Sequence, residues 1–361
     1  MSQAAHRNNA DWQTVLEARV AQLREKTGLT GVAAAVVADG QSAGVAARGE
    51  RRRGSGIPVT IDDRWHVGSI TKSITATLVA VLQDDGRLSL DDTLPALLPD
   101  IAMAGGWDGC TLHHLLTHTA GAPANFPLKV QRVWPTTPQE LVAARRRFIA
   151  GVLAREPRNA CGARHVYSNV GYTIAGHIAE TIAGKPYEIL VRDHVFAPLK
   201  LTSAGFGPPQ GDAPNLEPVG HVVWLRWFRS PMDPFATRAD NSPVLAPAGC
   251  AHMTIGDLAR YGAAHLEGES GTPPGLLPRS TWERLHTPFL DDYASGWVRN
   301  SSDSAGGPVI WHNGSNTMWY ALLVVLLTRK LVLAFATNDG AIRVAETAFV
   351  KLSQELAASV S

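Results

Sequence analysis

The chain of 361 residues lacks the marks of several large classes of protein. Its 33 lysines and arginines nearly balance its 32 aspartates and glutamates, so bulk charge predicts no nucleic-acid partner and no anionic membrane surface. The arginine triplets at 51–53 and 145–147 are short and isolated, and we interpret them as solvated surface. No apolar run of about 18 residues occurs, and positions 1–11 lack the apolar stretch of a signal peptide. We therefore expect no membrane partner and a cytoplasmic location for the chain as written, or a periplasmic or secreted one if a native leader was removed.

Cysteine is scarce as well, with Cys110, Cys161 and Cys250 far apart and no C-x-x-C pair. This spacing predicts neither a structural zinc site nor a disulfide framework, so we interpret all three as thiols. His114 and His118 lie one helical turn apart, but the glutamate of the helical zinc motif H-E-x-x-H is missing, which favours structural histidines. The sequence also has no P-loop, dinucleotide fingerprint or G-x-S-x-G elbow. We expect no metal and no cofactor.

The two ends of the chain show matching apolar patterns. A helix is predicted from Asp11, which suits an N-cap, to a stop at Gly28, and two strands at 32–38 and 43–47 follow it across an Asp-Gly turn. Near the other end, two strand patterns precede a helical one, at 319–327, 331–336 and 341–356. These ends are expected to share one antiparallel sheet.

The middle of the chain has a different character, because helical patterns there alternate with loops rich in proline and glycine. The loops at 205–218 and 230–247 hold many of the prolines, and we interpret them as long ordered loops that wall a pocket. The helical patterns lie at 69–84, 112–117, 138–153 and 170–183.

The fold class predicted from this order is α/β (α+β). An antiparallel sheet flanked by helices is expected to carry a mostly helical domain as an insert, with the active site between the two. The single catalytic unit is expected over 12–357, with 1–68 and 288–361 forming the sheet part and 69–287 the helical part.

The first chemical motif is Ser69-Ile70-Thr71-Lys72, at the start of an apolar helical pattern. Residues three apart share a helix face, so Lys72 would point back at the Ser69 hydroxyl and act as its base once burial lowers the lysine pKa. The helix N-terminus would add the Ser69 backbone N–H as half of an oxyanion hole. A lone S-x-x-K is more often a capping serine beside a solvent-facing lysine. Of the seven lysines, however, only Lys72 has a serine three residues before it.

A second motif, Tyr167-Ser168-Asn169, is the only Tyr-x-Asn in the sequence and precedes a predicted helix. A phenol beside an ammonium group relays protons, and the Asn169 amide can donate to one partner and accept from another. Considered alone, the motif is an ordinary polar turn. It supports a catalytic role only because Ser69 and Lys72 occur in the same sequence.

A third motif ends a strand pattern near the C-terminus, at His312-Asn313-Gly314-Ser315. A glycine there permits close approach of a ligand to the backbone. The Ser315 N–H could then complete the oxyanion hole begun by Ser69, because acyl transfer needs two converging donors.

The order S-x-x-K, Y-x-N and H-x-G resembles the active-site set of the serine β-lactamase and penicillin-binding-protein superfamily. The branch it resembles most contains the class C β-lactamases, the D-alanyl-D-alanine carboxypeptidases of similar pattern and the related bacterial esterases. The resemblance covers roughly residues 30–340 and includes the stretches 115–121, 247–249 and 293–297. It implies a β-lactamase/transpeptidase-like fold.

By this resemblance Ser69 is acylated, and Lys72 and Tyr167 act as one coupled unit that moves its proton and activates the deacylating water. Asn169 and the third motif are implied to hold the substrate. The third motif departs from the class C pattern, where a lysine followed by threonine and glycine is usual. His312 is mostly neutral at pH 7, so recognition of a β-lactam carboxylate should weaken.

We therefore predict a serine hydrolase that forms a Ser69 acyl-enzyme with a small-molecule ester, amide or peptide, of the carboxylesterase or D-amino-acid peptidase type. A β-lactamase and a non-catalytic penicillin-binding-like sensor are the alternatives. Arg299 is a weaker candidate for a carboxylate contact, because a solvent-facing arginine is commoner. Trp224, Trp227 and Phe228 are interpreted as core or loop packing. The sequence does not indicate an oligomeric state.

Overall fold

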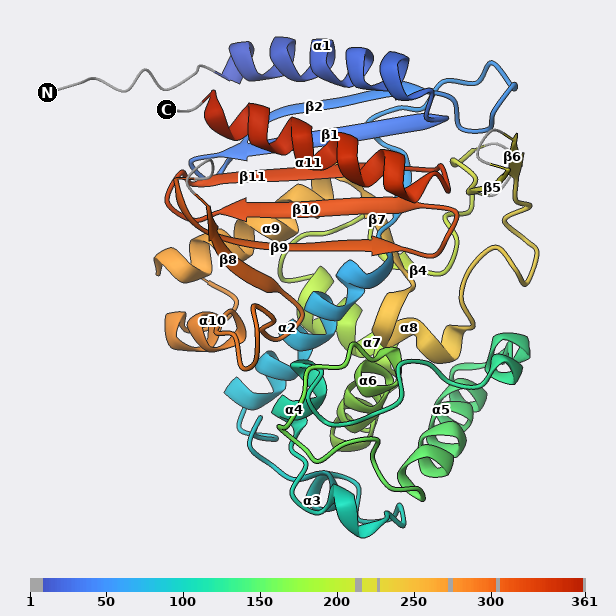
Figure 1. Cartoon of the computed structure of the whole chain (residues 1–361), viewed down its shortest axis with the longest axis vertical. Helices are drawn as coiled ribbons and strands as arrows, with labels where there is room; N and C mark the ends of the chain where they lie inside the picture. Colours follow the sequence, from blue (N-terminus) through green and yellow to red (C-terminus); the bar gives the residue numbers. More distant parts are fainter. Residues whose placement is uncertain (1–8, 212–215, 226–227, 272–274, 303–305, 360–361) are drawn as a thin grey trace, which may run out of the picture.

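The computed structural model describes residues 9–211, 216–225, 228–271, 275–302 and 306–359. Figure 1 shows a sheet covered by two long helices at one end of the molecule and a mostly helical body at the other. The sheet is antiparallel throughout, with the order β2-β1-β11-β10-β9-β8. Its strands are β1 (Gly31–Ala38), β2 (Gln41–Gly49), β8 (Val298–Ser302), β9 (Gly307–Ser315), β10 (Tyr320–Leu326) and β11 (Leu331–Thr337).

The two chain ends meet in the middle of this sheet, where β1 pairs with β11 from Val32↔Thr337 to Ala38↔Leu331. Side chains of a strand alternate between faces, and both faces of these central strands are buried. This explains why the sequences of both strands are continuously apolar instead of alternating. The expected sharing of one antiparallel sheet is confirmed.

One face of the sheet is covered by α1 (Asn9–Thr27) and α11 (Ile342–Ala358), which lie side by side in Figure 1. Gly44 lets α1 approach β2, because a Cβ atom there would come within 3.2 Å of the Gln13 backbone. The Gln13 amide then bonds both the N–H and the C=O of Val45, each at 2.9 Å. The predicted apolar stripe of α1 is Val15, Leu16, Val20 and Leu23. Leu16, Val20 and Leu23 are buried, each contributing about 1.5–3 kcal/mol, whereas Val15 is only partly buried and Trp12 joins the buried set.

The opposite face of the sheet meets the helical body and α9 (Ile255–Ser270), which packs on β1, β10 and β11. This helix lies within the range 69–287 that the sequence assigns to the helical part, yet it belongs to the sheet layer. The other helices are α2 (Thr71–Asp84), α3 (Leu94–Leu97), α4 (Leu112–Leu116), α5 (Pro138–Leu153), α6 (Asn169–Ala183), α7 (Tyr187–Val191), α8 (Ala246–Gly249) and α10 (Arg279–Leu285).

Two small sheets complete the fold. β3 (Arg64–His66) and β4 (Gly205–Phe206) flank β7 (Ala251–Thr254), and this sheet leads the chain into the site described below. β5 (His221–Trp224) and β6 (Phe228–Pro231) form a hairpin at the surface. Part of the predicted loop at 205–218 lies outside the described residues.

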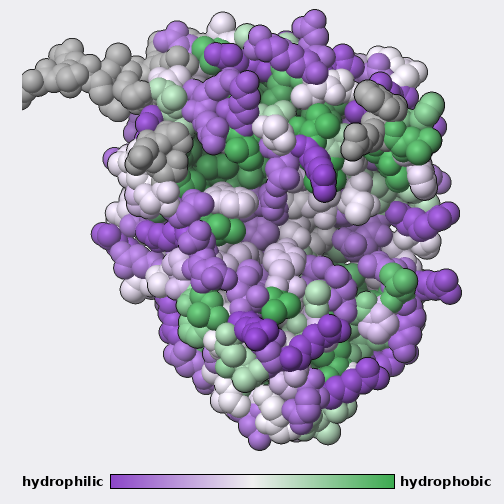
Figure 2. Space-filling view, viewed as in Figure 1, coloured by the Kyte–Doolittle hydropathy of each residue, from purple (hydrophilic) through white to green (hydrophobic). Residues whose placement is uncertain are grey.

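The surface of the molecule is mixed. On the face seen in Figure 2 hydrophilic residues predominate, and the green patches are interrupted by purple ones. Among the large apolar side chains that are exposed, Trp224 (60%) and Phe228 (66%) lie on the β5–β6 hairpin, so of the predicted core or loop packing the core is excluded for these two residues. Trp227 lies outside the described residues. No described helix is long and apolar enough to cross a membrane.

Arg145 corrects the interpretation of its triplet as solvated surface. Its guanidinium is completely buried beneath α5, where it pairs with Glu180 and Glu188. It also donates to the carbonyl oxygens of Pro243 (2.8 Å) and Val244 (3.2 Å). A buried cation needs such partners, because leaving it alone in the interior would cost several kcal/mol. The side chain therefore ties α5, α6 and α7 to the turn that precedes α8.

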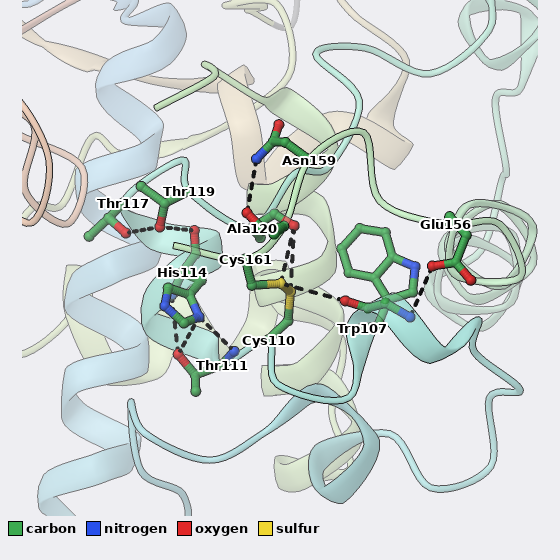
Figure 3. Close-up of a disulfide and its surroundings, with 12 residues drawn as sticks. Trp107, Cys110, Thr111, His114, Thr117, Thr119, Ala120, Glu156, Asn159 and Cys161 are labelled. Atoms are coloured by element: carbon green, nitrogen blue, oxygen red, sulfur yellow. Dashed lines mark hydrogen bonds between the residues drawn. A yellow bond between two sulfur atoms is a disulfide. The ribbon is translucent and has the colours of Figure 1, made fainter. Parts of the chain in front are cut away.

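Cys110 and Cys161 form a disulfide, with 5.4 Å between their Cα atoms. The prediction of three thiols is therefore wrong for this pair, while Cys250 is free and buried. Figure 3 shows the bond between the segment that begins at Trp107 and the segment that contains Asn159. Two cysteines so far apart in sequence gave no spacing signal, because the fold alone brings them together.

Candidate active site

Ser69 lies in a short 3₁₀ turn, Gly68–Ile70, between β3 and α2. The prediction placed it at the start of the helix, and the α-helix itself begins two residues later, at Thr71. Gly68 has φ +52°, a left-handed conformation that favours glycine. A side chain at Gly68 would also overlap the backbone of Ser315. The turn thus holds Ser69 half-buried at the wall of a cleft.

Lys72 is completely buried and points at Ser69. Its Nζ lies 3.0 Å from Ser69 Oγ, 2.7 Å from Asn169 Oδ1 and 2.6 Å from the carbonyl oxygen of Ala248. All three partners are uncharged. Burial therefore lowers the pKa of Lys72 well below its usual value, because nothing among these partners offsets the loss of hydration. A neutral amine at this position can accept a proton.

Tyr167 lies on the other side of Ser69, just before α6. The Lys72 Nζ lies 4.7 Å from the centroid of its ring, and its hydroxyl is near enough to the Ser69 side chain to influence the pKa of the phenol. Although 37% of the residue is exposed, desolvation raises the pKa of Tyr167 to about 12, and the interaction with the Ser69 side chain partly offsets this. The structure thus brings Ser69, Lys72 and Tyr167 together.

Asn169 is the first residue of α6, which Ser168 caps by accepting the Gly171 N–H at 2.9 Å. Its amide oxygen accepts from Lys72, and its Nδ2 donates to Asn125 Oδ1 at 2.7 Å. The amide is thereby oriented from both sides, and it lines the cleft.

The end of β9 packs directly on the Ser69 turn. A Cβ atom at Gly314 would overlap the carbonyl oxygen of Val67 and the amide nitrogen of Ser69, so the two backbones touch. Only a residue without a side chain permits this approach. The arrangement brings Ser315 to the wall of the cleft beside Ser69, as two oxyanion donors require.

His312 and Asn313 leave β9 on opposite faces, because side chains alternate along a strand. His312 is only 3% exposed, and its Nε2 lies 3.0 Å from the hydroxyl of Tyr293. Burial and the nearby Lys72 lower the pKa of His312 to about 3, so it carries no charge at neutral pH. Asn313 instead donates to the Tyr320 hydroxyl and to Glu346, each at 3.2 Å. Its side chain therefore lies away from Ser69, contrary to the prediction for this residue.

A cleft of about 400 Å³ opens above Ser69. The predicted loop at 230–247 forms one of its walls, as expected. Most of its lining residues are polar, which suits a substrate with several hydrogen-bonding groups. They include Asn125, Gln131, Asn169, Thr237, Arg238, Asp240, Asn241, Asn316 and Thr317.

His66 and Asp240 support the Ser69 turn and were missed in the sequence. The Nδ1 of His66 accepts the Gly68 N–H at 3.1 Å, and its Nε2 lies 2.9 Å from Asp240 Oδ1. Asn316 donates to the same carboxylate oxygen at 3.0 Å. His66 stands next to the first motif, which was a usable signal, whereas nothing in the sequence marks Asp240 as its partner.

His118 is a further residue whose role was missed. It is 98% buried with φ +60°, and its ring centroid lies 4.3 Å from that of Tyr167. The prediction of a structural histidine holds for His114, which forms a capping box with Thr111 at the start of α4. No cluster of metal ligands occurs among the described residues.

Arg299 does not reach the cleft. Its Nη1 donates to Glu269 at 2.7 Å, and the same carboxylate accepts from His286 at 2.9 Å. The Arg299 side chain therefore neither faces solvent nor contacts a substrate carboxylate in the cleft, because its ion pair with Glu269 holds it elsewhere.

Three comparisons with known proteins agree with the geometry. Penicillin-binding protein 4 of Amycolatopsis lactamdurans is 28% identical, over 97% of this chain and 89% of that protein. The D-alanyl-D-alanine-carboxypeptidase/endopeptidase AmpH of Escherichia coli K12 is 25% identical, over 67% of this chain and 59% of that protein. A solved D-stereospecific amidohydrolase from a Streptomyces species superposes with a TM-score of 0.71 and 26% identity, over 96% of this chain and 98% of that one.

The fold is that of the β-lactamase and transpeptidase proteins, because solved penicillin-binding-protein homologues superpose on nearly the whole chain. A homologue from Pyrococcus abyssi, for example, superposes with a TM-score of 0.76 and 22% identity, over 95% of this chain. The family model described as Beta-lactamase matches residues 16–351. The resemblance in the three motifs therefore reflects common descent, and the chain belongs to the β-lactamase family of serine hydrolases.

Proposed function

We propose that this protein hydrolyses a small amide, ester or peptide through an acyl-enzyme on Ser69. One observation carries the proposal: the buried Lys72 amine lies 3.0 Å from Ser69 Oγ and has only uncharged partners. Burying a lysine beside a serine is costly in a protein that only binds. It is useful in one that must remove the serine proton.

In the acylation step, Ser69 Oγ bonds to the substrate carbonyl carbon while neutral Lys72 takes the hydroxyl proton. The oxyanion forms where the backbone N–H groups of Ser69 and Ser315 converge. Collapse of this adduct breaks the bond to the leaving group. The leaving nitrogen or oxygen receives a proton that passes from Lys72 through the Tyr167 hydroxyl.

Deacylation reverses this proton route. A water molecule attacks the acyl carbon and gives its proton to the same pair, and Ser69 regains a proton as the acid product departs. Lys72 and Tyr167 act together, so their titration belongs to the pair.

Among the possible substrates, we favour an amide or short peptide of the D-amino-acid type over a β-lactam. The cleft is lined by amide and hydroxyl side chains, and His312 adds no charge for a β-lactam carboxylate. The relatives named for carboxypeptidase and D-stereospecific amidohydrolase activity support the same choice. A simple ester remains the second candidate, because the same acyl-enzyme chemistry would cleave it more easily.

A parallel assay tests the proposal. A short-chain p-nitrophenyl ester, nitrocefin and a D-alanyl-D-alanine peptide are each incubated with wild type, Ser69→Ala and the control Ser55→Ala, whose serine lies in an exposed turn. We expect turnover of the peptide or the ester in wild type and the control, and none in Ser69→Ala. Mass spectrometry after fluorophosphonate treatment should place the adduct on Ser69. Absence of both turnover and adduct would leave a sensor as the better account.

A further inference from the structure

Gly68, the residue before Ser69, has both of its polar backbone atoms held by side chains. Its N–H donates to Nδ1 of His66 at 3.1 Å, and its carbonyl oxygen accepts from the Thr71 hydroxyl at 2.6 Å. His66 and Thr71 are completely buried, so bulk water does not compete for either bond. Because glycine adds no steric restraint of its own, these two side chains do much to fix the conformation of the turn.

The Thr71 hydroxyl is directed at Gly68 by a third group. Its oxygen accepts the Ala251 N–H of β7 at 3.0 Å, while its proton goes to the Gly68 carbonyl oxygen. The backbone N–H of Thr71 is shared between the carbonyl oxygens of Gly68 and Ser69. The hydroxyl is therefore the donor that serves Gly68 alone.

His66 is held on its far side as well. Because its Nδ1 accepts the Gly68 N–H, its ring proton lies on Nε2, which is 2.9 Å from Asp240 Oδ1. Asp240 comes from the loop at 230–247 that walls the cleft. The turn is thus tied to β7 through Thr71 and to the cleft wall through His66.

The peptide between Gly68 and Ser69 carries the N–H proposed above as an oxyanion donor. In a trans peptide the C=O and the N–H point in opposite directions. By fixing the direction of the Gly68 carbonyl, Thr71 also fixes the direction of the Ser69 N–H. A rotation of this peptide would turn the donor away from the place where it is to meet the Ser315 N–H.

We propose that Thr71 and His66 are positioning residues for acylation, which hold the Ser69 N–H in the direction that the oxyanion needs. This inference rests on the function proposed above and adds two residues to the machinery of that site. Neither residue lines the cleft, so both act through Gly68 and not on the substrate. A donor that is held before the reaction needs no reorganisation when the negative charge develops.

The first experiment exchanges one hydroxyl. Thr71→Val removes it with little change of shape, and Thr71→Ser keeps it. The control is Thr77→Val, the same exchange on the same helix, where a buried hydroxyl donates to the Ser73 carbonyl oxygen at 3.0 Å. For each variant, kcat and KM are measured with the substrate that wild type turns over fastest in the parallel assay, and thermal unfolding reports stability.

A second readout addresses the oxyanion itself. Stopped-flow acylation rates are compared for a p-nitrophenyl ester and its thionoester, in which sulfur replaces the carbonyl oxygen. Sulfur is a weak hydrogen-bond acceptor, so the ester-to-thionoester ratio reports how well the two N–H groups are aimed. A general defect in folding lowers both rates together and leaves this ratio unchanged.

We expect kcat to fall about 10–100-fold in Thr71→Val with little change in KM, and the ester-to-thionoester ratio to fall with it. Thr71→Ser should recover most of both. Thr77→Val should keep the wild-type kcat and ratio, even where it lowers the unfolding temperature.

Two variants of His66 test the other side of the turn. The oxygen of His66→Asn reaches the place of Nδ1 and can accept the Gly68 N–H, whereas the amide of His66→Gln reaches the place of Nε2, beside Asp240. We expect His66→Asn to retain most of kcat and His66→Gln to lose about tenfold. The control is His252→Gln, the buried cross-strand neighbour of His66, whose Nδ1 lies 2.9 Å from the Gly207 carbonyl oxygen.

A wild-type kcat and ratio in folded Thr71→Val would overturn the inference, and so would an equal loss in Thr77→Val. If Thr71→Val does not fold, His66→Gln as active as His66→Asn would overturn it. Failure of the proposed function is a different result, because wild type itself would then show no turnover and no fluorophosphonate adduct on Ser69.

Discussion

His118 holds Tyr167 in place by accepting hydrogen bonds from Val166 and Ser168, the residues on either side of Tyr167. The backbone oxygen of His118 accepts the Val166 N–H at 2.8 Å, and its Nδ1 accepts the Ser168 N–H at 3.0 Å. Between these two bonds, the imidazole lies against the phenol ring, with 4.3 Å between centroids. Burial and the nearby Lys72 lower the pKa of His118 well below its usual value, which keeps the ring neutral and Nδ1 free to accept.

Replacing His118 with phenylalanine should lower kcat with little change in KM. The variant keeps a ring but loses the Nδ1 acceptor, and a displacement of about 1 Å in a catalytic group costs on the order of 100-fold. Steady-state kinetics over a range of pH would test this, with thermal unfolding as the check on folding. His113→Phe serves as the control, because His113 lies on α4, the short helix that ends just before His118. Wild-type kcat in a folded His118→Phe protein would show that Tyr167 is positioned without this ring.

Lys72 should behave as a base whose pKa is well below that of an ordinary lysine. Its folded pKa is lowered, so the fraction of neutral amine rises as pH passes through that lowered value, and acylation should be active well below the usual lysine pKa of about 10.4. Lys72→Arg replaces it with a permanent cation and should reduce acylation by about 10²–10⁴-fold. Stopped-flow acylation with a p-nitrophenyl ester measures both effects. An acylation rate that rises only above pH 10 would contradict a lowered pKa.

The same burial should make Lys72 a cost to stability. The unfolded state binds more protons than the folded state between the lowered pKa and the ordinary one, so this residue's contribution to stability becomes more favourable as pH rises through that window. We expect Lys72→Met to stabilise the fold by roughly 1 kcal/mol at pH 7, as functional residues often trade stability for activity. Urea unfolding would measure it, with the exposed Lys351→Met as control. A destabilised Lys72→Met would mean that its three hydrogen bonds outweigh the burial.

Arg145 should be one of the most sensitive positions outside the site. Arg145→Ala would leave Glu180 and Glu188 without their cation and should destabilise the fold by about 3–5 kcal/mol. Arg146→Ala, at the neighbouring exposed position, is the matched control and should change stability by less than about 0.5 kcal/mol. Chemical denaturation of both variants gives the difference. Similar midpoints for the two variants would contradict a structural role of the buried pair.

The disulfide between Cys110 and Cys161 predicts how many thiols will react and in which compartment the protein works. The denatured protein should show one reactive thiol, Cys250, before reduction and three after it. Because such bonds persist in oxidising compartments, we propose that the protein works outside the cytoplasm, which is the second of the two locations considered from the sequence. Cys110→Ala should lower stability by about 2–4 kcal/mol under oxidising conditions. Three reactive thiols in protein purified without reductant would contradict both the bond and the proposed compartment.

Much of the fold was predictable, because its ends follow simple periodicities. The strands at 32–38 and 331–336 and the helices that cover them were found from apolar runs and stripes, which depend only on local sequence. Arg145 and the Cys110–Cys161 bond were misjudged because their partners lie far away in the chain, and no local pattern records such contacts.

In the candidate site, too, local sequence indicated some of the contacts, and others are created only by the fold. Ser69 and Lys72 are only three residues apart, in the 3₁₀ turn and in the first turn of α2 that follows it, so their spacing was informative. His66–Asp240 and His118–Tyr167 join separate segments, and only the fold places them side by side. The side chain of Asn313 was predicted on the wrong face of β9. The face to which a strand residue points depends on the register of the strand, and a sequence motif does not specify that register.

The touching backbones of Gly68 and Gly314 have a consequence for the order of events on the ribosome. The Ser69 turn is synthesised early, whereas β9, which brings Ser315 to the cleft wall beside Ser69, emerges near the end and pairs with β10 after that. Chains leave the ribosome N-terminal part first, and long-range strand pairing is slow. A nascent chain therefore carries Ser69 and Lys72 before Ser315, the second donor of the oxyanion hole proposed above, can reach them, so the proposed site is incomplete until β9 has emerged and paired.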